Sequence, residues 1–150
     1  MKSIVEKVEE FSRAFEAEVV PIEHWPSLAP LCRSAIAEEL AELESAMKQT
    51  WAARMLNHRV TQYAGMHDTI DALGDIVYVT LDMAYRLGCL HLLPEAMEQI
   101  HKSNMSKLGE DRKPLKREDG KIMKGPDFTP PEFHDISAID GEGNIIFAPR

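Results

Sequence analysis

The sequence is poor in cysteine and has no long hydrophobic run, and each absence excludes a class of protein. Cys32 and Cys89 are the only cysteines and form no CxxC pair, which excludes a disulfide framework and a thiol-rich zinc site and favours a reducing compartment. The best apolar run, residues 76–81, is closed at both ends by Asp75 and Asp82, so it is far shorter than the roughly 18 apolar residues of a membrane helix. The charged N-terminal residues are unlike a secretory signal. We therefore expect a cytoplasmic protein with no membrane partner.

Positive charge is also in deficit, which argues against nucleic acid as a partner. The 17 Lys and Arg residues stand against 25 Asp and Glu residues, for a net charge of −8, whereas a general duplex-DNA binder is expected to be basic. The charge is uneven, because residues 102–124 hold eight basic and four acidic residues, a net +4 that leaves −12 for the rest. An acidic body with a basic arm suits a metal-bound anionic ligand, although it is also an ordinary pattern for solubility.

What the sequence does contain is a helical pattern of apolar residues over much of its length. Its 150 residues, 44% hydrophobic and 28% charged, fit one globular domain. Residues 76–81 are rich in β-branched side chains and suit a buried strand by propensity, but the apolar pattern around them continues at helical spacing, which favours a helix. Four helices are predicted, over residues 2–18, from 27 to at least 51, over 62–87 with Gly88 as a left-handed stop, and from Pro94 to about 108.

The predicted fold is all-α, a four-helix bundle followed by an extended basic arm. Prolines, glycines and charges dominate from Glu110 onward, and residues 136–148 are compatible with a small terminal hairpin. We predict a helical catalytic domain over residues 1–109 and an arm over 110–150 that packs on the same domain. The two central helices are too apolar for a lone bundle of this size, so we expect a homodimer or homotetramer.

The first group of residues that could perform chemistry is Glu38-Glu39-x-x-Glu42. Residues three and four apart on a helix share a face, so Glu39 and Glu42 can direct their carboxylates at one point while Glu38 flanks them. Taken alone, this pattern is common on solvated helix faces.

The second group is Asp68, Asp71 and Asp75, which also share one helical face. Aspartate is unfavourable inside a helix, and three on one face repel one another. A divalent cation would compensate two such acidic groups on adjacent helices, and hard oxygen ligands favour Mg²⁺ or Mn²⁺ over zinc. The alternative is a solvated acidic surface.

A third group lies in the basic segment, as Ser-Asn-Met-Ser-Lys over residues 103–107 and Asp-Gly-Lys-x-x-Lys-Gly-Pro over 119–126. Lysines can neutralise phosphate, and Asn and Ser add hydrogen-bond donors. The alternative is a charged helix end followed by a solvated loop.

A P-loop is absent, and the histidines show no metal-binding spacing. The aromatic side chains of Phe11, Phe15, Trp51 and Tyr78 are expected in the core, with Phe11 and Phe15 as minor candidates for a nucleobase wall.

In this order and spacing, the three groups resemble the all-α NTP pyrophosphohydrolases, the superfamily of MazG, dimeric dUTPases and phosphoribosyl-ATP pyrophosphohydrolase. The resemblance runs from Val8 to about Pro131 and is greatest to the small MazG-like branch of bacteria and phages. It implies a helical dimer or tetramer that requires Mg²⁺ and cleaves between the α and β phosphates, giving a nucleoside monophosphate and pyrophosphate.

The resemblance also implies which residues bind the metal. Glu39 and Glu42 match the family's ExxE motif, and Asp75 matches the last residue of its ExxD motif. The Glu of ExxD falls at Ala72, which cannot bind metal, and Asp71 is the expected substitute one residue earlier. The implied ligands are thus Glu39, Glu42, Asp71 and Asp75, with Mg²⁺, or Mn²⁺, as the ion.

The remaining roles carried over from the family concern the base and the substrate. Glu38 matches the acid that activates water in close relatives, and Asn104, Lys107, Lys121 and Lys124 are expected to contact the substrate. We expect hydrolysis of surplus or non-standard nucleotides, with dUTP or dCTP as the first guess.

Three other functions stay open. Phosphoribosyl-ATP hydrolysis is the alternative within the same chemistry. A non-catalytic helical interaction module, whose acidic faces bind a basic partner, is the alternative outside it, and Ala72 supports it. Nucleic-acid binding is supported only by residues 102–124.

Overall fold

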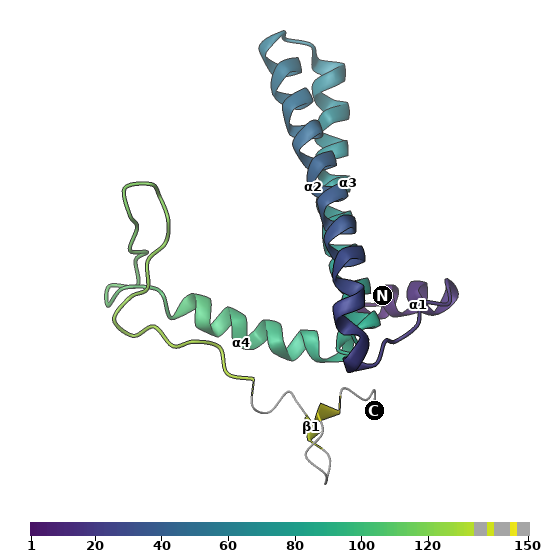
Figure 1. Ribbon diagram of the computed structural model, residues 1–150. Coiled ribbons are helices and arrows are strands. Elements are labelled where there is room, and N and C mark those ends of the chain that lie inside the picture. The colour runs from purple at the N-terminus through teal and green to yellow at the C-terminus, as the bar shows by residue number, and fades with distance from the viewer. Residues whose placement is uncertain (134–137, 140–144, 147–150) are drawn as a thin grey trace. The chain divides into compact units, whose positions relative to one another are not determined.

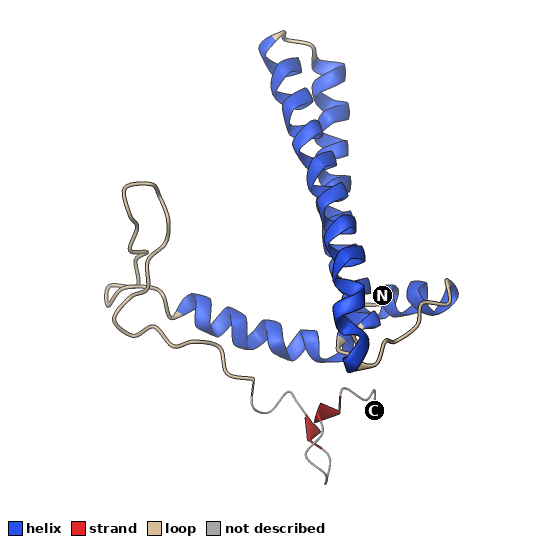
Figure 2. Cartoon of the chain, in the orientation of Figure 1, coloured by secondary structure: helices blue, strands red, loops and turns tan. Residues whose placement is uncertain are grey.

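The computed structural model describes residues 1–133, 138–139 and 145–146 (Figure 1). Helices make up almost all of its regular structure (Figure 2), so the expected all-α class is confirmed. The main helices are α1 (Ile4–Ala14), α2 (Trp25–Met55), α3 (Arg59–Arg86) and α4 (Leu93–Met105), with short 3₁₀ turns η1 (Ile22–His24) and η2 (Leu90–Leu92) and two short strands, β1 (Ala138–Ile139) and β2 (Ile145–Ile146).

The long helices α2 and α3 lie side by side as a hairpin joined by residues 56–58 (Figure 1). Small side chains form the seam between them, because Ala46 and Ala53 of α2 and Gly65 and Ala72 of α3 are all buried. A Cβ atom added at Gly65 would lie 2.4 Å from the Oγ1 atom of Thr50 and 3.2 Å from its backbone nitrogen. The absence of a side chain at residue 65 therefore lets the two backbones approach closely.

The centre of α3 is where β propensity predicted a strand and the apolar spacing predicted a helix. Residues 76–81 are helical, as the apolar spacing predicted, and Gly88 has the expected left-handed backbone with φ of 72°. The helix begins at Arg59, three residues earlier than predicted. His58 caps it, since its Nδ1 atom lies 3.3 Å from the backbone nitrogen of Thr61, which donates to it.

Helix α1 is shorter than its apolar pattern predicted. A capping box starts it, in which Ser3 and Glu6 satisfy each other's backbone N–H groups. The prediction of a helix to residue 18 is wrong at the C-terminal end, because Glu16 adopts a left-handed backbone with φ of 54° and the N–H of Ala17 donates back to Ser12. Val19 therefore lies outside the helix and is 54% exposed.

The chain divides into two compact units, Met1–Leu90 and His91–Arg150. The first holds α1, α2 and α3, and the second holds α4. The predicted helical domain over residues 1–109, with an arm over 110–150 packed on it, remains a prediction.

Among the described residues, no single helix is long and apolar enough to cross a membrane, and α3 passes such a test only jointly with the segment Leu90–Met105.

Residues 107–125, which include the start of the predicted arm, form a closed loop, which we call the basic loop. Its ends meet where the N–H of Gly125 donates to the carbonyl of Lys107 at 3.1 Å, and the N–H of Met123 donates to Leu115 across the loop at 2.7 Å. Gly125 is buried, and a Cβ atom there would lie 2.4 Å from the carbonyl oxygen of Leu108.

Strands β1 and β2 pair antiparallel, with Ala138 opposite Ile146 and Ile139 opposite Ile145. This pairing matches the expected terminal hairpin. The rest of that prediction falls on residues 136–137, 140–144 and 147–148, which lie outside the described residues.

Large apolar side chains contribute little to the interior of the described part of the chain. The buried hydrophobic residues there are mainly alanines, together with Val8 and Leu90. By contrast, the α2–α3 hairpin exposes many large ones: Leu31, Leu40, Met47, Trp51, Met55, Val60, Tyr63, Met66, Ile70, Leu73 and Val77.

Candidate functional site

The three aspartates of α3 line one open pocket of ≈ 610 Å³, which we call the acidic pocket. Asp68, Asp71 and Asp75 are all exposed, in agreement with the single helical face predicted from their spacing. The other lining residues are Ile4 of α1 and His67, Ile70, Gly74 and Tyr78 of α3. The pocket thus combines three carboxylates with apolar and aromatic side chains.

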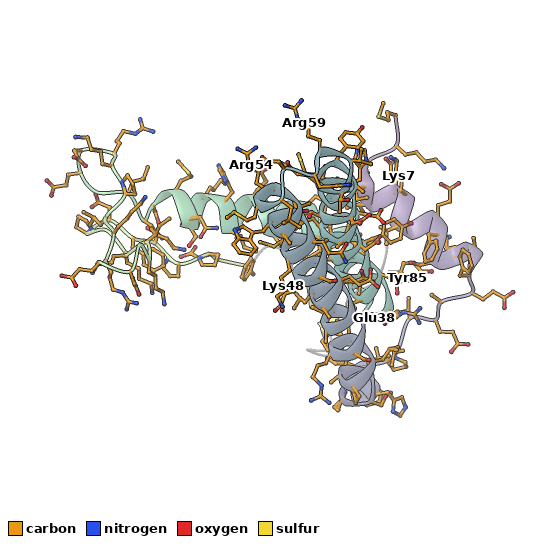
Figure 3. All side chains as sticks on the ribbon, turned by 90° about the horizontal axis from the view of Figure 1, so that it is seen from above. Lys7, Glu38, Lys48, Arg54, Arg59 and Tyr85 are labelled. Carbon is orange, nitrogen blue, oxygen red and sulfur yellow. The ribbon has the colours of Figure 1, made fainter. Side chains whose placement is uncertain are left out.

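The glutamates of α2 differ in their exposure; Glu38 is labelled in Figure 3. Glu38 and Glu42 are exposed, whereas Glu39 is half-buried, and its Oε2 atom is buried without a hydrogen-bond partner. Loss of solvent around this carboxyl is the main reason why the pKa of Glu39 is raised above its usual value. Neighbouring negative charges raise the pKa further, in the decreasing order Glu42, Asp75, Glu38 and Asp71.

The pKa of Glu39 therefore links the two acidic groups that the sequence singled out. Two of the four carboxylates that act on Glu39, Asp71 and Asp75, lie on α3, so the acids of α2 and α3 share one electrostatic environment. A carboxylate oxygen that is buried, unpaired and surrounded by like charge is costly to ionise. A divalent cation would remove that cost.

The donor set fits a hard cation, but the side chains are not gathered around one point. Within the part of the chain that the structure describes, no three His, Cys, Asp or Glu residues form a group able to hold a metal ion. The orphaned Oε2 atom of Glu39 and the carboxylate oxygens around it are the ligands that Mg²⁺ and Mn²⁺ prefer. Rotamer changes of the exposed carboxylates would be needed to bring them onto a shared ion.

Ala72, the position at which the sequence resemblance predicts a glutamate, is only 3% exposed and belongs to the helix–helix seam. Its neighbour Asp71 lies instead on the side of α3 that faces the acidic pocket, beside Asp75. The substitution therefore leaves the seam apolar and places a carboxylate on the pocket side.

The four residues expected to contact substrate all belong to the second unit. The ammonium of Lys107 donates to the Oδ1 atom of Asn104 at 2.6 Å, so these two side chains lie together. Lys121 and Lys124 lie in the basic loop, and the Nζ atom of Lys124 is 4.2 Å from the centre of the Phe128 ring. Their role toward the acids of the first unit stays a prediction.

Five lining residues of the acidic pocket were not predicted as site residues from the sequence: Ile4, His67, Ile70, Gly74 and Tyr78. His67 and Tyr78 could have been found, because they lie four residues before Asp71 and three after Asp75, on the same helical face. Ile4 could not, since it reaches the pocket from a separate helix and only tertiary packing places it there.

One known family matches the chain over the helices that carry these acids. The family model of phosphoribosyl-ATP pyrophosphohydrolase matches residues 4–104, about two thirds of the chain, and no curated protein matches it. The matched segment includes all the acids described above and Asn104, but it ends before the basic loop. The chain therefore belongs to the phosphoribosyl-ATP pyrophosphohydrolase family, within the MazG-like superfamily of all-α pyrophosphohydrolases.

Proposed function

We propose that the protein is a Mg²⁺-dependent pyrophosphohydrolase of nucleoside triphosphates, which converts a (d)NTP into the monophosphate and pyrophosphate in the control of the nucleotide pool. Membership of the family supports the reaction class, hydrolysis of a phosphoanhydride bond. The observation that carries the proposal is the Oε2 atom of Glu39, buried and unpaired among carboxylates from two helices. Such an atom is explained by a cation that brings a polyphosphate to the site.

The side chains that would hold the ion are Glu39, Glu42, Asp71 and Asp75. Mg²⁺ bound by them would neutralise part of the triphosphate charge and polarise the α-phosphoryl group. The partial burial of Glu39 keeps water from one of its oxygens, which strengthens its attraction for a cation. Without a cation, the same carboxylates would repel the substrate.

Glu38 is the proposed general base, because it is exposed on α2 next to Glu39. The attacking water forms its bond to the α-phosphorus while the bond from that phosphorus to the bridging oxygen breaks. Glu38 accepts the proton of the water, and the electron pair of the broken bond leaves with pyrophosphate. The proposed contacts of Asn104, Lys107, Lys121 and Lys124 would offset the charge of that leaving group.

Phosphoribosyl-ATP is the second candidate substrate, and the family match itself favours it. It presents the same kind of phosphoanhydride bond next to a larger organic group. The acidic pocket is open and so sets no narrow limit on the size of that group. We keep dUTP and dCTP as the first guess among nucleotides.

The test is pyrophosphate release from purified protein, measured with dUTP, dCTP, the other NTPs and dNTPs, and phosphoribosyl-ATP, each with and without Mg²⁺. Metal-dependent release of pyrophosphate with a monophosphate co-product is expected, and the compound that is hydrolysed fastest identifies the substrate class. A Glu39→Ala variant serves as the inactive control, and Glu44→Gln, an exposed glutamate outside the acidic group, serves as the matched active control. If the folded wild-type protein releases no pyrophosphate from any of these substrates, the proposal is contradicted.

We also propose that the protein acts as a homo-oligomer, with a dimer or tetramer both open. A second pocket of ≈ 500 Å³ lies on the α2–α3 hairpin, and its apolar lining includes Met47, Trp51, Met66 and Ile70. All four side chains are at least half exposed. A contiguous surface of this kind is typical of a protein interface. The fully buried residues of the described hairpin are alanines and Gly65, so a second copy is the partner that we propose would bury its large side chains.

A further inference from the structure

Helix α1 is attached to α3 by a small set of contacts on one of its faces. Val8 and Ser12, one turn apart, are both 0% exposed. Between them, the ring of Phe11 meets the ring of Tyr78 edge to face, with the centroids 5.3 Å apart. Tyr78 also lines the acidic pocket, so the attachment of α1 and the wall of the pocket share a residue.

The polar part of this attachment centres on Asp82. The Oγ atom of Ser12 lies 2.7 Å from one carboxylate oxygen of Asp82 and 2.9 Å from the carbonyl oxygen of Val8. A hydroxyl has one proton, and the charged oxygen is the stronger acceptor. The Nε atom of Arg86 donates to the other oxygen of Asp82 at 2.8 Å.

Asp82 belongs to the same stripe of α3 as the pocket acids but differs from them in its surroundings. It follows Asp75 by seven residues and Asp68 by fourteen, spacings that return to the same face of a helix. Its side chain is only 19% exposed, whereas the pocket acids are exposed. With one oxygen bound to Ser12 and the other to Arg86, Asp82 is a partnered carboxylate and no candidate for a shared ion.

Two further hydrogen bonds hold the segment of chain that follows α1. The N–H of Val20 donates to the carbonyl of Arg86 at 2.7 Å, and the indole of Trp25 donates to the carbonyl of Val20 at 3.1 Å. Ser12 and Val20 are thus each bonded to the last turns of α3, and Val20 is also bonded to the first residue of α2. At the other end of α1, Ile4 reaches the acidic pocket.

We propose that Ser12 and Asp82 are positioning residues, which hold α1 against α3 so that Ile4 joins Tyr78 in the wall of the acidic pocket, and that they thereby set the affinity for the substrate. This inference rests on the proposed function of the pocket. Neither residue touches the substrate. Their effect is exerted through the place of α1, and it falls on binding rather than on the chemical step.

Two measurements on the full chain test the proposal in a Ser12→Ala variant, which removes one oxygen and adds no volume. Amide hydrogen exchange in residues 4–14 should become faster, because the anchor is lost. The KM for the best substrate should rise by about tenfold or more, the size expected for a lost hydrogen bond to a charged group, while kcat changes by less than about twofold. Affinity for Mn²⁺ alone should stay unchanged.

Three further variants sharpen the result. Asp82→Ala should act like Ser12→Ala, and Asp82→Asn should raise KM less, because its amide oxygen still accepts the hydrogen bond from Ser12. Glu10→Gln is the matched control on α1, since it removes only the exposed ion pair with Lys2, and it should leave both exchange and KM unchanged.

The outcomes separate this proposal from the function on which it rests. Unchanged exchange in Ser12→Ala would show that the bond does not anchor α1, and faster exchange with an unchanged KM would show that α1 is no wall of the substrate site. A fall in kcat or in Mn²⁺ affinity would also overturn it, because the effect would then reach the metal ligands or the base. A wild-type chain without any turnover would instead refute the proposed function, and this inference with it.

Discussion

Glu39 is the side chain on which the chemistry of the site depends most. Its pKa is raised above 4.5 because the carboxyl is poorly solvated and lies among other negative charges. The folded chain therefore takes up a proton at a pH where the unfolded chain has already released it. An ionised Glu39 destabilises the metal-free fold, and that penalty disappears as the pH falls from the raised pKa toward 4.5.

We predict that Glu39→Gln raises the melting temperature of the metal-free protein at pH 7, because it removes the repulsion without removing the side chain. The difference from wild type should shrink as the pH falls through the raised pKa. Mg²⁺ should raise the melting temperature of the wild type by binding to the native state, and this rise should be lost in the variant. Thermal scans with and without Mg²⁺ measure both effects.

Glu44→Gln is the control for that experiment, because Glu44 is an exposed residue of α2 paired with Lys48. It should respond to Mg²⁺ as the wild type does. Equal stabilisation of Glu39→Gln by Mg²⁺ would contradict the metal site, and no response from the wild type would favour the non-catalytic interaction module.

Substitutions of Glu38 and Asp75 should have different effects on turnover and on metal binding. Glu38→Gln should lower kcat by about 10²- to 10⁴-fold, the usual range for a lost general base, while Mn²⁺ still binds. Asp75→Ala should lose both activity and Mn²⁺ binding. Steady-state kinetics combined with Mn²⁺ titration distinguish the two, and full activity in either variant would remove that residue from the site.

At the scale of the elements, the seam between α2 and α3 is the feature most sensitive to volume. Gly65→Ala should lower the free energy of unfolding by about 1–3 kcal/mol, because the new methyl group would overlap Thr50 and force the helices apart. Gly74→Ala is the matched control on the same helix. Nothing lies within 4 Å of a Cβ atom there, so it should stabilise α3 by up to about 1 kcal/mol.

Denaturant unfolding of both variants measures this difference. Equal effects of the two substitutions would mean that helix propensity, and not the closeness of the seam, controls the stability of the hairpin.

The sequence predicted the elements well where the apolar spacing was long and less well at their ends. Residues 76–81 are helical because the periodicity of the whole segment outweighs the local β propensity. The end of α1 was missed because Glu16 adopts a left-handed backbone, which side-chain patterns do not reveal for a residue other than glycine. The spacing of Asp68, Asp71 and Asp75 predicted their shared face, whereas the contribution of Ile4 depends on packing between helices.

At the scale of the whole molecule, the exposed apolar face of the α2–α3 hairpin predicts an interface between copies of the chain. We predict that Trp51→Glu, which places a charge on a side chain that is 67% exposed, converts the oligomer into monomers. Light scattering after size-exclusion chromatography measures the mass. Gln49→Glu, at an exposed position of the same helix, should leave the mass unchanged, and a wild type that is already monomeric would contradict the interface.

The basic loop has its two ends joined by the bond between Gly125 and Lys107, and the chain on either side of it is held separately, since the Oγ atom of Ser106 accepts the N–H of Thr129 at 2.9 Å. A segment that leaves and returns to one point is a self-contained insertion, which can be lengthened, shortened or recharged without displacing its surroundings. The family model stops before this segment. The helices that carry the acids, α2 and α3, are therefore expected to fold in the same way when the length of this loop is changed.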